Sequence, residues 1–98
     1  MAIRGYRDRA ARDIAAGVNS KQARRCLPVE LHEFARRRLA FLAASQSLDD
    51  LRARRSLNLH ALSRERVGQH AIRINDQYRI CFKWTAGDVD EVEITDYH

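Results

Sequence analysis

The sequence contains few residues that interrupt regular structure: among 98 residues there are four glycines and one proline. A chain of this length and composition is expected to form one ordered domain over residues 1–98, without a low-complexity segment. Cysteine is also scarce, because Cys26 and Cys81 are too few for a disulfide framework. We therefore expect a protein of the reducing cytoplasm.

Long apolar runs are missing as well. No segment approaches the roughly 20 apolar residues of a membrane span. Residues 1–18 are rich in arginine but are interrupted by Asp8 and Asp13, and they lack the apolar stretch of a signal peptide. The sequence thus predicts no membrane partner.

Lysine is nearly absent, since Lys21 and Lys83 are the only two of the 18 basic residues that are not arginine. An arginine guanidinium presents a planar fork that matches phosphate oxygens, so the net charge of +5 suits a nucleic-acid partner. A genome rich in G and C also favours arginine, and composition alone does not separate these explanations. Residues 85–98 contain five acidic and no basic residues. An acidic C-terminal strand is therefore expected within a basic body.

Motifs for metal and nucleotide chemistry are missing too. The four histidines, His32, His60, His70 and His98, do not have the close spacing of metal ligands, and the two cysteines lie far apart. The sequence contains neither a glycine-rich phosphate loop nor a serine nucleophile motif. It therefore predicts no metal and no cofactor.

The first half of the chain carries helical patterns. A short strand over residues 2–6 is followed by a predicted helix over residues 8–16, which ends at Gly17. Residues 19–26 are polar and basic, and they form either a loop or the first turn of the next helix. Pro28 begins the clearest helix, with Arg38 at the margin of its apolar stripe. That stripe contains Leu31, Phe34, Ala35, Leu39 and Leu42.

The second half changes to the period of strands. Leu48 and Leu51 are expected to reach the core, and residues 52–55 to form a basic loop. Alternation then predicts strands over residues 57–62, 72–74, 78–84 and 89–97, with turns at residues 75–76 and 86–88. The predicted class is α+β: a short N-terminal strand and two helices packed on one face of a largely antiparallel sheet of four to five strands.

Two features indicate where a site lies. Apolar residues account for one face of the strand over residues 78–84, which leaves Arg79 and Lys83 on the other face. Two cations on an open face suit an anion, although ordinary exposed alternation gives the same pattern. The chain ends in Asp96, Tyr97 and His98, three groups capable of proton transfer. These last residues are either a solvated tail or a site at the tip of a strand.

Three segments form a more specific pattern: LHAL at residues 59–62, GQHAIRINDQYRICFKW at 68–84 and VEITDYH at 92–98. Together they resemble the HigB toxins of bacterial toxin-antitoxin modules, the plasmid-maintenance killer branch of the RelE/ParE superfamily. The resemblance is specific over residues 57–98, whereas the first half agrees only in the order of its elements.

This resemblance implies a RelE-like (microbial RNase-like) fold. It also implies a type II toxin that enters the A site of the small ribosomal subunit and cleaves mRNA there, as an endoribonuclease that inhibits translation. The implied partners are the ribosome, mRNA and a HigA-like antitoxin with a helix-turn-helix domain. The functional positions of the family fall on His60, Arg79, Asp96, Tyr97 and His98.

One position departs from the family pattern, because members often carry lysine where this chain has Ser63. Arg64 or Arg66, in the adjacent loop, is a candidate to supply the missing charge. The expected RNA-binding residues are therefore Arg64, Arg66, Arg73 and Lys83.

Cleavage of RNA without a metal needs a base for the 2′-OH proton, a cation for the phosphorane and an acid for the 5′-oxygen. His60 and His98 suit the two proton roles, in an order that the sequence does not fix, since imidazole titrates near neutral pH. We expect Arg79 to contact the scissile phosphate, Asp96 to orient or tune a histidine, and Tyr97 to stack on a base or donate a hydrogen bond. Two alternatives remain: a non-catalytic poison of the ParE type, and a protein that acts mainly as a co-repressor subunit of a toxin-antitoxin complex.

Overall fold

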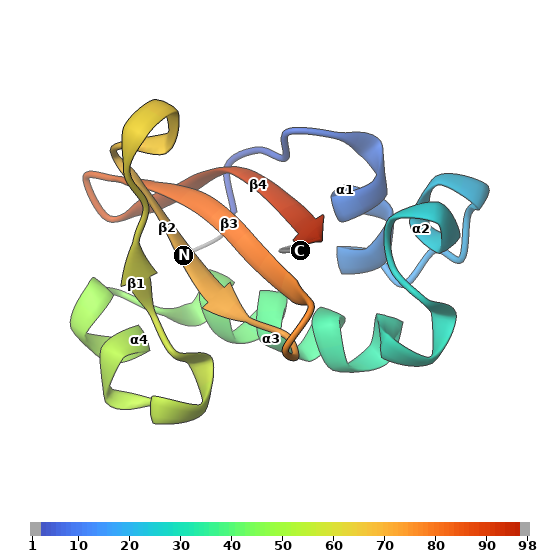
Figure 1. The fold of residues 1–98 in the computed structure, drawn as a ribbon, viewed down its shortest axis with the longest axis horizontal. Coiled ribbons are helices and arrows are strands. Elements are labelled where there is room, and N and C mark those ends of the chain that lie inside the picture. Colours follow the sequence, from blue (N-terminus) through green and yellow to red (C-terminus); the bar gives the residue numbers. More distant parts are fainter. Residues whose placement is uncertain (1–2, 97–98) are drawn as a thin grey trace.

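The computed structural model describes residues 3–96, which form a four-stranded sheet with helices packed on one face (Figure 1). The helices are α1 (Arg9–Ala15), α2 (Lys21–Cys26), α3 (His32–Ala44) and α4 (Leu48–Ala53). The strands are β1 (His60–Ala61), β2 (Gln69–Arg73), β3 (Tyr78–Thr85) and β4 (Asp88–Asp96). Short 3₁₀ turns cover Val29–Leu31, Arg55–Leu57 and Arg64–Arg66. This arrangement confirms the predicted α+β class, but the described residues contain two more helices than predicted.

Side-chain caps explain the additional short helices. Ser20 Oγ accepts a hydrogen bond from Ala23 N at 3.1 Å, and Ser47 Oγ accepts one from Asp50 N at 3.2 Å. Such caps satisfy backbone donors that a helix start leaves unpaired. Residues 19–26 are therefore neither a loop nor the first turn of α3, and most of the predicted basic loop at residues 52–55 belongs to α4 and to the 3₁₀ turn after it. Leu51 is fully buried, as predicted.

Helix α3 lies beneath the sheet and buries Ala35, Leu39 and Leu42, as its stripe predicts (Figure 1). The expectation for Phe34 was wrong, because this side chain is exposed. Phe34 lies at the edge of the buried stripe, one helical turn before Arg38, and its ring carries the Arg38 guanidinium instead of entering the core.

The predicted strand over residues 57–62 was also largely wrong. Leu57 is buried, but it belongs to a 3₁₀ turn, and Asn58 adopts the left-handed conformation with φ of 49°. That conformation interrupts an extended backbone, so pairing begins only at His60. Strand β1 thus consists of two residues.

The sheet is an antiparallel meander in the order β1-β2-β3-β4, as predicted. The turn between β2 and β3 depends on Asn75 Oδ1, which accepts hydrogen bonds from the backbone N–H groups of Gln77 and Tyr78 at 2.9 and 2.8 Å. The turn between β3 and β4 has positive φ at Ala86 (52°) and Gly87 (84°), and a turn of this kind matches the twist of the flanking strands.

The N-terminal segment lies parallel to β4 but forms only isolated bridges, at Ile3 and Tyr6. It replaces the strand predicted over residues 2–6, of which residue 2 lies outside the described part. A bulge in β4, with Glu91 at φ of 50°, shifts the register and limits continuous pairing there. Gly5 leaves room for Asp90 at this crossing, since a Cβ on residue 5 would lie 2.6 Å from Asp90 Oδ1 and the Asp90 side chain would have to move.

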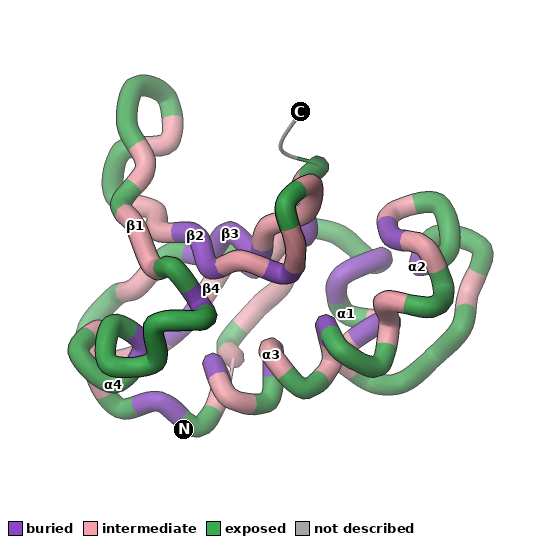
Figure 2. The backbone as a smooth tube through the Cα atoms, turned by 60° about the horizontal axis from the view of Figure 1, so that its bottom comes forward, coloured by how far each residue is buried: buried purple, intermediate pink, exposed green. Residues whose placement is uncertain are grey.

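The core lies between the helices and the inner face of the sheet. In Figure 2 the buried residues run along β2, β3 and the helix faces that meet them, whereas the loop after β1 is exposed. Ile80, Phe82 and Val92 are fully buried on this inner face. The opposite face of the sheet, called the outer face below, carries the alternate residues of each strand.

Candidate functional site

The strand register defines which side chains share the outer face. His60 pairs with Ala71, Ala71 with Cys81, and Cys81 with Glu93, so these four residues form one row across the sheet. The next row along the strands contains Arg73, Arg79 and Thr95. Directly paired residues lie on the same face of a sheet. His60 and Arg79 therefore share the outer face, as the predicted site requires.

The separation of His60 and Arg79 follows from this register. They lie two strands apart and one row apart, which corresponds to about 10 Å across the sheet and about 7 Å along it between backbones. A histidine and an arginine side chain can reach toward each other over that span. Both residues therefore lie within the span of one short RNA segment on the outer face.

A hollow of about 240 Å³ opens beside His60 on this face. Its lining comes from β1, the loop after it, β3 and β4, and consists of His60, Ala61, Leu62, Ser63, Arg66, Cys81 and Thr95. Arg79 does not line this hollow, but its cross-strand partner Thr95 does. Burial raises the pKa of the Cys81 thiol, so this group is neutral and serves as lining.

Arg66 brings a cation into the hollow next to Ser63. Its Nη2 lies 3.0 Å from Glu93 Oε1, and its Nη1 donates a hydrogen bond to Gln69 Oε1 at 3.0 Å. The Glu93 side chain is only 16% exposed and also lies 3.6 Å from Arg7 Nη1. Arg66 is thus held in place from β4, whereas the other candidate for the missing lysine, Arg64, is exposed and does not line the hollow.

The Glu93–Arg66 contact leads to a stability prediction. Replacing Glu93 with glutamine leaves Arg66 without its carboxylate, and we expect the free energy of unfolding to fall by about 1–2 kcal/mol. Urea denaturation measures this loss. The control is Glu91→Gln on the same strand, whose pair with Lys83 is exposed and 3.9 Å long, and which is expected to cost under about 0.5 kcal/mol. Equal losses in both variants would show that Glu93 does not hold Arg66.

The other predicted site residues on the outer face lie outside the hollow. Arg79 Nη1 donates hydrogen bonds to the carbonyl oxygen of Tyr78, at 3.1 Å, and to that of Asn75. These bonds fix its guanidinium near the β2–β3 turn. Arg73 also lies on the outer face and pairs with Asp76. Lys83 lies on that face beyond Cys81.

Asp96 is placed differently. It ends β4 opposite Tyr78, on the side of the sheet that the helices cover, and its Oδ2 accepts a hydrogen bond from Gln77 Nε2 at 3.1 Å. The structure therefore places His60 and Arg66 at the hollow, Arg79 on the same face near the β2–β3 turn, and Asp96 at the end of β4. The predicted site residues Tyr97 and His98 lie outside the described residues.

Sequence reasoning missed Glu93 and Thr95 as components of this face. The signal was present in the sequence, because the apolar Val92 and Ile94 alternate with Glu93 and Thr95, which places residues 93 and 95 on the face opposite the core. The spacing of three between the buried Val89 and Val92 also marks the bulge that sets their register.

Neither a metal site nor a membrane span is found within residues 3–96. No group of three His, Cys, Asp or Glu side chains there could hold a metal ion. Within the same residues, no helix combines the length and apolar character needed to cross a membrane.

Comparison with known families agrees with the fold. A sequence model described as "RelE-like toxin of type II toxin-antitoxin system HigB" matches residues 17–98, which include every residue of the outer-face site. No curated protein matches the chain. The match covers most of the chain, including α2 to β4, and it extends the resemblance found in the second half of the sequence. The chain belongs to the HigB-like family, the RelE-like toxins of type II toxin-antitoxin systems.

Proposed function

We propose that this toxin is a metal-independent endoribonuclease that cleaves mRNA in the A site of the small ribosomal subunit and thereby arrests translation and growth. The observation that carries the proposal is the shared outer face of His60 and Arg79, beside a hollow that contains the Arg66 guanidinium. Imidazole and guanidinium groups supply proton transfer and charge stabilisation without a metal.

The reaction needs three contributions. A base takes the proton of the 2′-OH, whose oxygen then attacks the adjacent phosphorus, and the bond to the 5′-oxygen breaks as an acid protonates it. In our proposal His60 and His98 are the two proton-transfer groups, and Arg79 binds the phosphorane oxygens. Asp96 orients or tunes a histidine, and Tyr97 stacks on a base or donates a hydrogen bond.

Four further cations are proposed to hold the RNA backbone. Arg66 lines the hollow, Arg73 and Lys83 lie on the same outer face, and Arg64 lies in the exposed turn beside it. Contacts of this kind act on phosphates regardless of sequence, and salt weakens them. They position the strand so that one phosphodiester lies between His60 and Arg79.

Membership in a type II toxin family implies a protein antitoxin. We propose that it is HigA-like, with a helix-turn-helix domain, and that an acidic segment of it binds the basic surface of the toxin. The net charge of +5 favours rapid association with such a segment.

The test is primer extension on cellular mRNA after induction of the toxin. Wild-type protein is expected to produce 5′ ends in phase with A-site codons, and His98→Ala is expected to abolish them. Intact transcripts with stalled replication would contradict the nuclease proposal in favour of a ParE-type poison. If the isolated protein does not inhibit growth, its main role is that of a co-repressor subunit.

A further inference from the structure

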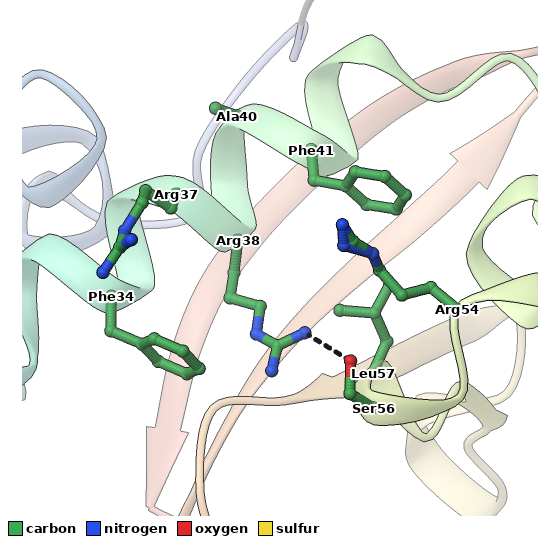
Figure 3. A pocket seen from close by; sticks show the side chains of 8 residues that line it. All are labelled: Phe34, Arg37, Arg38, Ala40, Phe41, Arg54, Ser56 and Leu57. Atoms are coloured by element: carbon green, nitrogen blue, oxygen red, sulfur yellow. Dashed lines mark hydrogen bonds between the residues drawn. The ribbon is translucent and has the colours of Figure 1, made fainter.

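A second hollow, of about 520 Å³, lies in the helical layer between α3 and residues 54–57 (Figure 3). We call it the α3 groove, and it is lined by Phe34, Arg37, Arg38, Ala40, Phe41, Arg54, Ser56 and Leu57. Since α3 packs on the inner face of the sheet, the groove is separate from the outer face that carries His60 and Arg79. The proposed nuclease reaction does not use it.

Two arginines in the groove lie on aromatic rings. The Cζ atom of Arg38 is 4.7 Å from the centroid of the Phe34 ring, and that of Arg54 is 4.5 Å from the Phe41 ring (Figure 3). Cation–π contact holds the long side chains and restricts their motion. Arg38 is further fixed by its Nη1, which donates a hydrogen bond to Ser56 Oγ at 3.4 Å. The two guanidinium groups are therefore arranged before any ligand binds.

The groove has cations but no acidic lining residue. Within residues 3–96, no carboxylate forms an ion pair with Arg37, Arg38 or Arg54. The Nε–H of Arg38 is buried without a hydrogen-bond partner there. Burial and the nearby charges of Arg54 and Arg73 lower the pKa of Arg38. A bound anion would offset this repulsion.

Two arginines near the groove, Arg36 and Arg52, do have acidic partners. Arg36 on α3 pairs with Glu33 at 2.6 Å, and Arg52 on α4 pairs with Asp49 at 2.6 Å. These pairs lie within one helix and outside the groove lining. Arg9, Arg12, Arg24 and Arg25 of α1 and α2 form no ion pair within residues 3–96 either, so the groove is distinguished by its two ring-bound guanidinium groups and not by the missing carboxylate alone.

The chemistry of the groove favours a protein ligand over RNA. A guanidinium group covers one face of each of the two rings, which leaves less aromatic surface for base stacking. The lining also includes the exposed side chain of Ala40 and the partly exposed Phe41, which suit an aliphatic or aromatic residue of a partner. A segment with carboxylates next to apolar residues complements both parts.

We propose that the α3 groove binds an acidic, amphipathic segment of the antitoxin. A carboxylate bridges the guanidinium groups of Arg38 and Arg54, and an adjacent apolar side chain packs on Ala40 and the accessible part of Phe41. This inference rests on the proposed antitoxin partner and specifies its docking surface. A segment bound there leaves the outer face uncovered, so inhibition by this contact acts by blocking entry into the ribosome rather than by filling the site.

The experiment measures the affinity of the full-length toxin for the antitoxin encoded next to its gene, by isothermal titration calorimetry at two salt concentrations. The double variant Arg38→Gln, Arg54→Gln is expected to bind at least about thirtyfold more weakly and to lose much of the salt dependence. Ala40→Glu places a competing carboxylate at the groove and is expected to weaken binding about tenfold.

The matched control is the double variant Arg24→Gln, Arg25→Gln. It replaces two exposed arginines of α2, so it removes the same charge without altering the groove. It is expected to bind within about threefold of wild type. Equal weakening in this control, or unchanged binding by the Arg38 and Arg54 variant, overturns the inference. Failure of the wild-type toxin to bind the antitoxin overturns the proposed partner itself. Loss of ribosome binding with intact antitoxin binding in the groove variant would identify the groove as an RNA contact and contradict the proposal.

Discussion

Replacing His60 with alanine is expected to slow cleavage of mRNA on programmed ribosomes by about 10²–10⁴-fold, the usual contribution of one positioned acid or base. The imidazole lies at the hollow on the outer face, and its Nδ1 is 3.1 Å from the carbonyl oxygen of Asn58. In the tautomer whose Nδ1–H donates a hydrogen bond to this carbonyl, the lone pair is on Nε2, which is the nitrogen able to accept a proton in the reaction. Single-turnover rates with purified toxin measure the chemical step directly.

The matched control for His60 is His70→Gln. His70 pairs with Ala61 and Phe82, so its side chain lies on the inner face, and its ring stacks on that of Phe82. It is on the neighbouring strand, close to His60 in the sheet but on the wrong side for the reaction. We expect the control to cleave within about fivefold of wild type, and the wild-type pH–rate profile to lose one limb in His60→Ala. A His60→Ala rate within threefold of wild type would exclude His60 as a proton-transfer group.

The sequence predicts the shared face of His60 and Arg79 better than it predicts the contact between Arg66 and Glu93. His60 and Arg79 lie on the same face because residues alternate along β3 and because the strands form an antiparallel meander. The alternation and the strand order can both be predicted from the sequence. The contact of Arg66 with Glu93 is different, since it depends on the bulge at Glu91 and on the path of the loop after β1. These long-range details are set by packing and not by local pattern.

The helices show the same distinction. The apolar stripe of α3 predicted the burial of Leu39 and Leu42, because a helix with one apolar face has one stable way to pack. α2 and α4 have only six residues each, and each depends on a serine cap, Ser20 or Ser47. Helices this short are not stable by themselves, so their formation depends on tertiary contacts that the sequence pattern does not display. The α3 groove was not predicted from the sequence because Phe34 was assigned to the core.

Arg79 is the residue whose replacement tests charge stabilisation. Hydrogen bonds from Nη1 to two backbone carbonyls, at Asn75 and Tyr78, hold its guanidinium in one orientation on the outer face. A preorganised cation costs little reorganisation when negative charge develops on the phosphorane. We expect Arg79→Ala to lower the single-turnover rate by about 10²–10³-fold, with a smaller change in affinity for the programmed ribosome.

Arg79→Lys separates charge from geometry. Lysine keeps the positive charge but lacks the planar fork, so we expect it to recover only part of the lost rate, about tenfold. Arg25→Ala, which removes one exposed charge from α2, is the matched control and is expected to cleave at nearly the wild-type rate. If Arg79→Lys restores full activity, the guanidinium acts only through its charge. If Arg79→Ala weakens ribosome binding and leaves the single-turnover rate unchanged, Arg79 anchors the RNA backbone. Another cation of the outer face must then stabilise the phosphorane, and the first candidate is Arg66, which lines the hollow.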